Sequence, residues 1–305
     1  MAKVLTSPSS FGEIDPKPFD ILKENGYEVI NNPFGRKLTE DEVIEIAKEC
    51  VGIVAGVEPL NQKVMDNLPN LRCISRVGVG MDSVDLDYAK QKGIVVTNTP
   101  DGPTRSVAEL TIAMTLALLR KVPQAHMNIK QGVWKKEIGN LMYEKKVGLI
   151  GLGKIGKLAA SQFQAFGCSV MAFDLYPETA WAEANDVEIV DMEKLLAESD
   201  IISLHIPKPD TELIGAAELE SMKEGSFLIN IARDGIVNEG ALYEALKSNK
   251  LAGAAIDVFS KEPYDGSLKE LDNIVLTPHI GSYAKEGKLQ MEIDAVNNLL
   301  NALSS

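Results

Sequence analysis

The chain has 305 residues, enough for two domains of ordinary size, and its 45% hydrophobic and 25% charged residues are typical of a globular protein. Its formal net charge of −13 argues against nucleic acid or an anionic membrane as the main partner, because both select for basic surfaces. No stretch approaches the roughly 20 consecutive apolar residues of a membrane span.

The amino-terminal stretch MAKVLTSPSS lacks the long apolar core of a secretory signal, so we expect a cytoplasmic protein. The three cysteines, Cys50, Cys73 and Cys168, form no C-x-x-C pair. Their spacing suggests neither a zinc ribbon nor a dithiol redox site, and we expect buried, reduced thiols and no metal.

Short apolar runs alternate with amphipathic stretches over residues 1–98. Runs rich in Val and Ile, such as KVLTS, VGIVAG and IVVTN, predict buried parallel strands. Between them, TEDEVIEIAKEC predicts a helix with Thr39 as N-cap and Glu42 three residues later. The alternation predicts a doubly wound α/β domain.

An almost continuously apolar segment, TRSVAELTIAMTLALLRKV, follows at 104–122 and predicts a helix buried between layers or domains. The strand–helix alternation then restarts with KVGLIGLG and continues to NIVLTPHIG, which predicts a second doubly wound domain. The final segment, 286–305, predicts an amphipathic helix with no strand after it. This helix must pack on one of the two blocks.

Three glycines with the spacing G-x-G-x-x-G follow the predicted strand KVGLI and open a predicted helix. Gly151 permits a tight turn, Gly153 lets the backbone approach a pyrophosphate, and Gly156 lets helix and strand pack closely. The free N–H groups of the helix start attract phosphates. This order of elements predicts a dinucleotide site.

The next predicted strand, SVMAF, ends at Asp174, eighteen residues after the last glycine. A carboxylate there is suited to accept hydrogen bonds from the adenosine ribose and repels a 2′-phosphate. The following residues, LYPET, supply no Arg to bind such a phosphate. The sequence therefore favours NAD(H) over NADP(H).

The chain has three histidines. His126 lies in a polar helical stretch, which indicates a surface position. His205 ends the strand-like run DIISLHIP, where open α/β sheets bind ligands, although packing is the preferred interpretation. His279 lies in LTPHIGS, a short loop between a proline and a glycine that suits a titrating imidazole held in fixed geometry.

Two further charged residues follow predicted strands. Arg233 comes after FLINIA, where a guanidinium can bind a carboxylate bidentately, and Glu262 lies in DVFSKEP. With His279 they form a set that hydride transfer to a ketone needs: a substrate anchor, a proton donor and a partner for that donor.

With these motifs, the sequence resembles the D-isomer-specific 2-hydroxyacid dehydrogenases, most closely their phosphoglycerate dehydrogenase-like branch. The resemblance covers nearly the whole chain and is carried, in order, by SRVGVGMDSVDLDYAKQKGIVVTNTP, SVAEL, GLIGLGKIG, INIARDGIVNEGALYEAL, AAIDVFSKEP and LTPHIGS. It implies two doubly wound parallel-sheet domains: a Rossmann NAD-binding domain, 99–280, inserted into a flavodoxin-like substrate (lid) domain, 1–98 plus 281–305.

The resemblance also implies roles for individual residues. Arg233, Glu262 and His279 correspond to the catalytic set. The implied cofactor contacts are Thr99, Gly151, Gly153, Lys154, Ile155, Gly156, Asp174, Ile206, Pro207, Ile231, Ala232, Asp257 and Gly281. The implied substrate contacts are Arg76, Val77, Gly78 and Arg233, with the loop 77–80 receiving the substrate carboxylate through its backbone.

Three features depart from the family pattern. Asp234 stands where Gly is common, and Arg105 stands where a small or apolar residue is common. The sequence ends at Ser305, so we expect no serine feedback through the C-terminal domains of longer relatives. The resemblance further implies a homodimer, with the apolar segment at 107–122 contributing to its interface.

The leading hypothesis is an NAD-dependent enzyme that interconverts a D-2-hydroxy acid and its 2-oxo acid, with 3-phosphoglycerate as the first candidate. A phosphorylated substrate needs cations: Arg76 is the best candidate, and Lys135 and Lys136 are alternatives that could reach across a dimer interface. Glyoxylate or hydroxypyruvate reduction is the alternative within the same chemistry. A non-catalytic NAD(H)-sensing scaffold or co-repressor is the alternative from another class.

Overall fold

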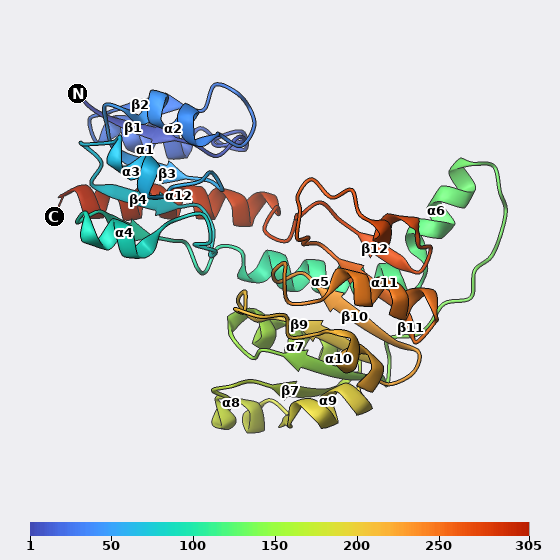
Figure 1. The fold of residues 1–305 in the computed structure, drawn as a ribbon. Helices are drawn as coiled ribbons and strands as arrows, with labels where there is room; N and C mark the ends of the chain where they lie inside the picture. The colour runs from blue at the N-terminus through green and yellow to red at the C-terminus, as the bar shows by residue number, and fades with distance from the viewer. Residues whose placement is uncertain (305) are drawn as a thin grey trace. The chain divides into compact units, whose positions relative to one another are not determined.

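The computed structural model describes residues 1–304, which form two compact units (Figure 1). One unit comprises Met1–Pro103 together with the chain from Ser282 onward, and the other comprises Thr104–Gly281. Residues 99–103, expected in the second domain, group with the first unit. The amide of Thr99 donates to the Gly78 carbonyl (3.0 Å), and the Gly78 amide donates to the Thr99 hydroxyl (2.8 Å).

The first unit contains a five-stranded sheet in which every neighbouring pair is parallel, as predicted. Its strands are β1 (Ala2–Thr6), β2 (Tyr27–Asn31), β3 (Cys50–Ala55), β4 (Cys73–Arg76) and β5 (Val95–Thr97), in the spatial order β2-β1-β3-β4-β5. This is the order of flavodoxin-like doubly wound sheets.

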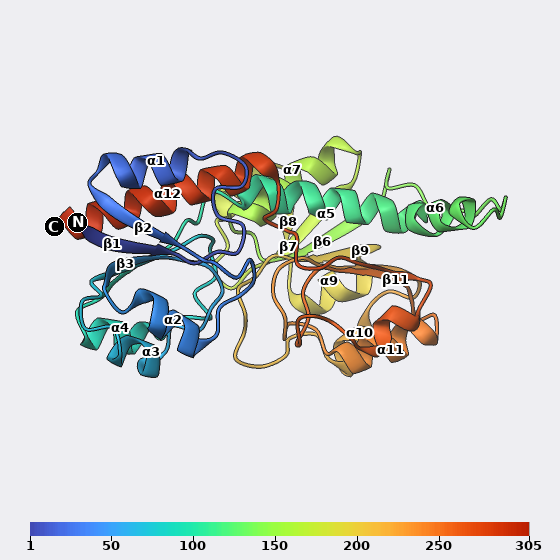
Figure 2. The same cartoon turned by 90° about the horizontal axis from the view of Figure 1, so that it is seen from above.

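Helices cover both faces of this sheet (Figure 2). They are α1 (Lys17–Glu24) and α12 (Lys285–Ser304) on one face, and α2 (Glu40–Ala47), α3 (Gln62–Asp66) and α4 (Leu86–Gln91) on the other. The final helix packs in the first unit, because Val296 and Leu299 are buried against Val4 and Val54. Both hydrogen bonds of the predicted capping box at the start of α2 are present.

The second unit contains a seven-stranded parallel sheet. Its strands are β6 (Lys146–Ile150), β7 (Ser169–Phe173), β8 (Val187–Ile189), β9 (Ile201–Leu204), β10 (Ser226–Asn230), β11 (Leu251–Ile256) and β12 (Ile274–Leu276), in the order β12-β11-β10-β9-β6-β7-β8. Apart from β12, this is the strand order of the Rossmann fold. The prediction of two parallel-sheet α/β domains is confirmed.

Helices also cover both faces of the second sheet, as Figure 2 shows. The set comprises α5 (Thr104–Leu119), α7 (Lys154–Ala165) and α8 (Thr179–Ala184) on one face, and α9 (Met192–Glu198), α10 (Ala216–Ser221) and α11 (Glu239–Lys247) on the other, with the short helix η1 (Ser267–Glu270) before β12. The apolar helix α5 buries Ile112 and Leu119 in the core around Phe163. Helix α6 (Val122–Lys130) has no buried residue.

Parallel strands place all their carboxyl ends along one edge of a sheet, and open α/β sheets bind ligands at that edge. In the second unit, the loops after β6, β9, β10, β11 and β12 begin there. Within residues 1–304, no helix is both long and apolar enough to cross a membrane.

At the corresponding edge of the first unit, Glu58 is buried with 1% of its surface exposed. Its carboxylate accepts hydrogen bonds from the Ser7 hydroxyl and from the Gly56 amide, which joins the ends of β1 and β3. Burial raises the pKa of Glu58, while these hydrogen bonds and the charge of Arg76 act in the opposite direction.

We predict that Glu58→Gln changes how stability depends on pH. A carboxyl whose pKa is raised by folding stabilises the fold fully below its ordinary pKa of 4.5, and this contribution is lost as the pH rises through the folded value. The wild type should therefore lose more free energy of unfolding than the variant between about pH 4 and about pH 7 in urea titrations.

Glu42→Gln serves as the control of opposite sign. The Arg36 side chain lowers the pKa of Glu42 to about 2, so the wild type should lose stability relative to this variant as the pH falls. Parallel pH profiles for the wild type and Glu58→Gln would contradict a raised pKa at Glu58.

Candidate active site

The turn between β6 and α7 has no room for side chains at two of its glycines. Gly151 has a positive φ of +97°, and a Cβ there would lie 2.5 Å from the His205 carbonyl oxygen. A Cβ at Gly156 would lie 2.2 Å from the Gly151 carbonyl oxygen. Gly153, the N-cap of α7, faces open space instead, so its backbone is accessible to a ligand at the helix N-terminus.

Asp174, immediately after β7, is bound to this turn. Its Oδ2 accepts a hydrogen bond from the Leu152 amide (2.7 Å), and its Oδ1 accepts one from the Tyr176 amide (2.8 Å). The carboxylate is therefore held in one orientation beside the glycine turn. The sequence had suggested only its contact with a ribose, so this bridging role is an addition from the structure.

These features fit a dinucleotide. The open backbone at Gly153 and the N-terminus of α7 suit a pyrophosphate, and Asp174 supplies an acceptor at the end of the next strand. Lys154 and Ile155 form the first turn of α7. Ile206 lies against the glycine turn, since its Cγ2 would be 2.8 Å from a Cβ at Gly151, and Pro207 follows it.

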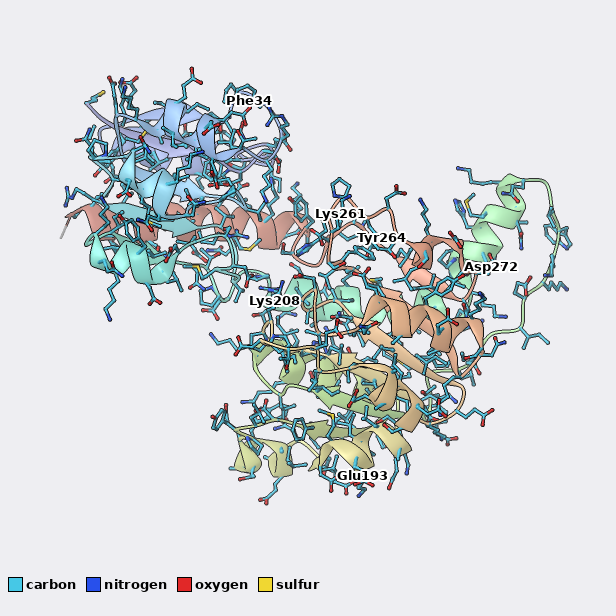
Figure 3. The ribbon with its side chains drawn as sticks, in the orientation of Figure 1. Phe34, Glu193, Lys208, Lys261, Tyr264 and Asp272 are labelled. Carbon is cyan, nitrogen blue, oxygen red and sulfur yellow. The ribbon has the colours of Figure 1, made fainter. Side chains whose placement is uncertain are left out.

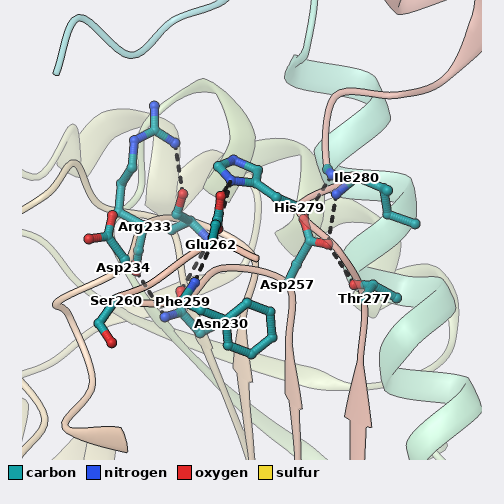
Figure 4. Close-up of polar contacts among 12 residues, drawn as sticks. Asn230, Arg233, Asp234, Asp257, Phe259, Ser260, Glu262, Thr277, His279 and Ile280 are labelled. Atoms are coloured by element: carbon teal, nitrogen blue, oxygen red, sulfur yellow. Dashed lines mark hydrogen bonds and ion pairs between the residues drawn. The ribbon is translucent and has the colours of Figure 1, made fainter. Parts of the chain in front are cut away.

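The loop after β12 carries His279 in a left-handed backbone conformation, with φ of +54°. This conformation is unfavourable for a residue other than glycine, so neighbouring bonds must hold it. Asp257, fully buried at the end of β11, supplies them: its carboxylate accepts hydrogen bonds from the Thr277 hydroxyl (2.5 Å), the Ile280 amide (2.8 Å) and the Gly281 amide (2.8 Å) (Figure 4).

Asp257 thus fixes the loop on both sides of His279. Burial raises the pKa of Asp257, while its three hydrogen bonds act in the opposite direction. Gly281, expected in the first domain, groups with the second unit through its bond to Asp257. It also packs on Ile231, whose Cγ2 would be 3.2 Å from a Cβ at that glycine. The expected contact of Asp257 with the cofactor remains a proposal.

His279 and Glu262 are in direct contact. The imidazole Nδ1 lies 3.0 Å from both carboxylate oxygens of Glu262, and each side chain is partly exposed. Because a carboxylate only accepts hydrogen bonds, Nδ1 carries the proton and Nε2 is left to act on a substrate. In the same stretch of chain after β11, the rings of Phe259 and Tyr264 stack with centroids 4.2 Å apart; Tyr264 is labelled in Figure 3.

Arg233 lies in the turn after β10, and its Nη1 donates to the Ala232 carbonyl (2.7 Å). The turn itself is held by Asn230, the last residue of the strand. The side-chain amide of Asn230 donates to the Arg233 carbonyl (3.0 Å) and accepts from the Ala232 amide (3.1 Å). The sequence interpretation missed Asn230, although a polar residue that ends an apolar strand was a signal.

Asp234, which departs from the family pattern, forms an ion pair with Lys208 (2.5 Å), which is labelled in Figure 3. Figure 4 shows the loops after β10, β11 and β12 bringing Arg233, Glu262 and His279 together at one edge of the second sheet. The structure therefore assembles the three residues selected from sequence within a single unit.

In the first unit, the expected carboxylate-binding loop is partly occupied by internal hydrogen bonds. The Val77 amide donates to the Ala55 carbonyl (2.9 Å), and the Gly78 amide donates to the Thr99 hydroxyl. Among residues 1–304, the amides of Val79 and Gly80 have no such acceptor. The role of the loop 77–80 in receiving a substrate carboxylate, with Val77 and Gly78 as contacts, remains a proposal.

Arg76, at the end of β4, lies over the same loop. Its Nη1 donates to the Val77 carbonyl and would be 2.9 Å from a Cβ at Gly78. Of the other cations considered, Lys135 is paired with Glu137 (2.6 Å), and Lys136 is exposed.

The remaining histidines lie outside the catalytic set. His126 is exposed on α6, and Arg105 is exposed in the first turn of α5. The Nε2 atom of His205 lies 3.0 Å from the Ser203 hydroxyl, and burial lowers the pKa of His205 to about 4, so this ring is neutral near pH 7. This agrees with a packing role.

The three thiols are free and buried, and burial raises their pKa values to about 11 for Cys50, about 12 for Cys73 and about 11 for Cys168. Across the described part of the chain, no three His, Cys, Asp or Glu residues are grouped so that they could hold a metal ion.

Comparisons with known proteins agree with this geometry. Residues 112–281 match the sequence model described as D-isomer specific 2-hydroxyacid dehydrogenase, NAD binding domain. The chain is 40% identical over 295 residues to D-3-phosphoglycerate dehydrogenase of Archaeoglobus fulgidus, covering 94% of this chain and 55% of that protein. It is 37% identical to hydroxypyruvate reductase of Thermotoga maritima, covering 87% of this chain and 89% of that protein.

The chain spans about half the length of the phosphoglycerate dehydrogenase it matches. A solved structure, the TT0316 protein from Thermus thermophilus, superposes with a TM-score of 0.91 at 34% identity, covering 99% of this chain and 97% of that one. Family model, relatives and fold all agree: the chain belongs to the D-isomer specific 2-hydroxyacid dehydrogenase family, and its second unit contains that family's NAD-binding domain.

Proposed function

We propose that this protein is an NAD-dependent dehydrogenase that interconverts a D-2-hydroxy acid and its 2-oxo acid. The observation that carries the proposal is the His279–Glu262 pair, with Nδ1 3.0 Å from both carboxylate oxygens, beside Arg233 on the same sheet edge. An imidazole oriented by a carboxylate is a general acid–base, and a neighbouring guanidinium is an anchor for a carboxylate substrate.

When bound, the nicotinamide supplies or accepts the hydride at the substrate C2. In reduction, Nε2 of protonated His279 gives its proton to the developing alkoxide, and in oxidation the neutral ring takes that proton back. The Glu262 carboxylate accepts a hydrogen bond from Nδ1 and so fixes the orientation of the ring. Arg233 binds the carboxylate of the substrate through its planar guanidinium.

For the cofactor, we propose that the glycine turn and α7 bind the pyrophosphate and that Asp174 binds the adenosine ribose. The contacts proposed to complete this set are Thr99, Gly151, Gly153, Lys154, Ile155, Gly156, Ile206, Pro207, Ile231, Ala232, Asp257 and Gly281. The open space around the Gly153 backbone and the fixed orientation of the Asp174 carboxylate support the assignment.

The leading substrate is D-3-phosphoglycerate, the substrate in the name of the archaeal relative. In the first unit, the proposed substrate contacts are Arg76, Val77 and Gly78. The Arg76 guanidinium lies against the loop 77–80, and a cation beside backbone amides suits an anionic group such as a carboxylate or a phosphate. The pairing of Lys135 with Glu137 makes it a weaker candidate for phosphate binding than Arg76.

Hydroxypyruvate reduction is the second candidate, because the chain is about as similar to a protein of that name, at 37% identity. Hydroxypyruvate has the same 2-oxo acid group as phosphohydroxypyruvate and lacks the phosphate. The His279–Glu262–Arg233 chemistry serves both, so the substrate depends on what binds the rest of the molecule.

We further propose a homodimer located in the cytoplasm. Large apolar side chains are exposed on α6 and the segment that follows it: Val122, Met127, Ile129, Val133, Trp134, Ile138, Leu141 and Tyr143. Exposed apolar patches of this kind mark interaction surfaces. Free, buried thiols are usual in reducing compartments.

The activity is tested by NADH oxidation with a panel of 2-oxo acids that includes phosphohydroxypyruvate, hydroxypyruvate and glyoxylate. His279→Ala should lower kcat by about 10²–10⁴-fold because the proton donor is lost, while NADH binding is retained. The exposed His126→Ala is the matched control and should keep full turnover. Tight NADH binding without turnover of any 2-oxo acid would favour a non-catalytic NAD(H)-sensing scaffold.

The cofactor choice is tested at Asp174. Asp174→Asn removes the negative charge that binds the ribose and repels a 2′-phosphate, so affinity for NAD⁺ should fall about tenfold while affinity for NADP⁺ does not fall. Titration calorimetry with both nucleotides measures the ratio. The exposed Asp186→Asn is the control; an unchanged NAD⁺/NADP⁺ ratio in Asp174→Asn would remove Asp174 from the ribose site.

The homodimer is tested by analytical ultracentrifugation. Ile138 is 91% exposed, so Ile138→Asp should shift the wild-type dimer toward monomer without unfolding the chain. Leu86→Asp, on α4 of the first unit, should leave the dimer intact. A wild-type monomer at micromolar concentration would refute the proposed assembly.

A further inference from the structure

Asn230 is a buried polar residue, only 3% exposed, at the carboxyl end of β10. Both the oxygen and the nitrogen of its side-chain amide form hydrogen bonds with the turn that carries Arg233. Oδ1 accepts from the Ala232 amide (3.1 Å), and Nδ2 donates to the Arg233 carbonyl (3.0 Å). Two hydrogen bonds of one side chain thus close this turn.

The position of the Arg233 guanidinium depends on this turn. Its Nη1 donates to the Ala232 carbonyl (2.7 Å). The side chain of Arg233 is therefore bound to the same turn, residues 231–233, that the Asn230 side chain closes. The other charged contact at the turn, between Lys208 and Asp234, has side chains 44% and 31% exposed. Exposed ion pairs hold geometry weakly, so this pair restrains the turn less than the hydrogen bonds of the buried Asn230 do.

Asn230 is also bonded to Asp257, the residue whose side chain holds the His279 loop. The Asp257 amide donates to the Asn230 carbonyl (3.0 Å), and the Asp257 side chain fixes the loop around His279. Asn230, at the end of β10, and Asp257, just after β11, are both buried. Asn230 therefore holds the turn with Arg233, and Asp257 holds the loop with His279 (Figure 4). Their direct bond connects the two loops.

We propose that Asn230 is a positioning residue that places the Arg233 guanidinium for binding the substrate carboxylate, relative to the His279 imidazole. The inference rests on the proposed dehydrogenase function. A side-chain amide suits this role because its donor, Nδ2, and its acceptor, Oδ1, are separate atoms that reach two different backbone groups. An aspartate keeps the acceptor for Ala232 but directs an oxygen at the Arg233 carbonyl oxygen.

The variants that test this are Asn230→Ala and Asn230→Asp, with Asn238→Ala as the matched control. Asn238 is the N-cap of α11, and its side chain also both accepts from a backbone amide and donates to an oxygen. The two Asn230 variants should lower kcat/KM for the 2-oxo acid on the order of 100-fold, mainly through KM, and leave NADH affinity within about twofold. The control should change thermal stability and not KM.

A double-mutant cycle separates positioning from general loosening. If Asn230 acts through Arg233, then adding Asn230→Asp to Arg233→Ala should lower kcat/KM by less than about threefold beyond Arg233→Ala alone. A further loss as large as that caused by Asn230→Asp in the wild type would overturn the inference.

A crystal structure of Asn230→Asp gives a readout that needs no turnover. The inference expects the Arg233 guanidinium to leave the Ala232 carbonyl while the His279–Glu262 pair stays in place; an unmoved Arg233 overturns it. If the wild type reduces no 2-oxo acid, the proposed function fails first, and this structure still decides whether Asn230 positions Arg233. If Asn230→Ala does not fold, Asn230→Asp, which keeps the side-chain volume, carries the test.

Discussion

The carboxylate of Asp257 is the interaction on which the arrangement of the candidate site depends. It accepts three hydrogen bonds from Thr277, Ile280 and Gly281, and these span the residue with the unfavourable left-handed backbone, His279. Burying a carboxylate costs free energy unless hydrogen-bond donors compensate the lost hydration. Here the compensating donors are groups of the loop that carries His279. The cost of burying Asp257 is thus offset by the bonds that define where the imidazole lies.

The same principle recurs at the other strand ends of the second unit. Asp174 binds two backbone amides beside the glycine turn, and Asn230 closes the turn that carries Arg233. Each of these polar residues ends or follows a buried strand, and its side chain forms hydrogen bonds with the backbone of a neighbouring loop. Loops held in this way keep functional groups in fixed positions without secondary structure of their own, which suits catalysis that depends on orientation.

Much of the fold and of the candidate set followed from the sequence. The Val- and Ile-rich runs predicted parallel strands, because strands buried on both faces have no polar alternation. The glycine spacing with Asp174 predicted a dinucleotide site, and the family's NAD-binding domain matches that region. Residues such as Asn230 were missed, because their importance comes from backbone groups three residues away or on another strand, which no local pattern encodes. For the same reason, no local pattern indicated that the hydroxyl of Thr99, distant in sequence, accepts a hydrogen bond from the Gly78 amide.

By itself, the sequence determined the class of each domain and the residue types available for chemistry, since periodicity, glycine spacing and charge at strand ends are local properties. Only the tertiary structure decided that the final helix packs against β3 and β4, that residues 99–103 group with the first unit, and that His279 meets Glu262 through Nδ1. Those outcomes depend on hydrogen bonds and apolar contacts between segments far apart in the chain, which form only once the sheets are in place.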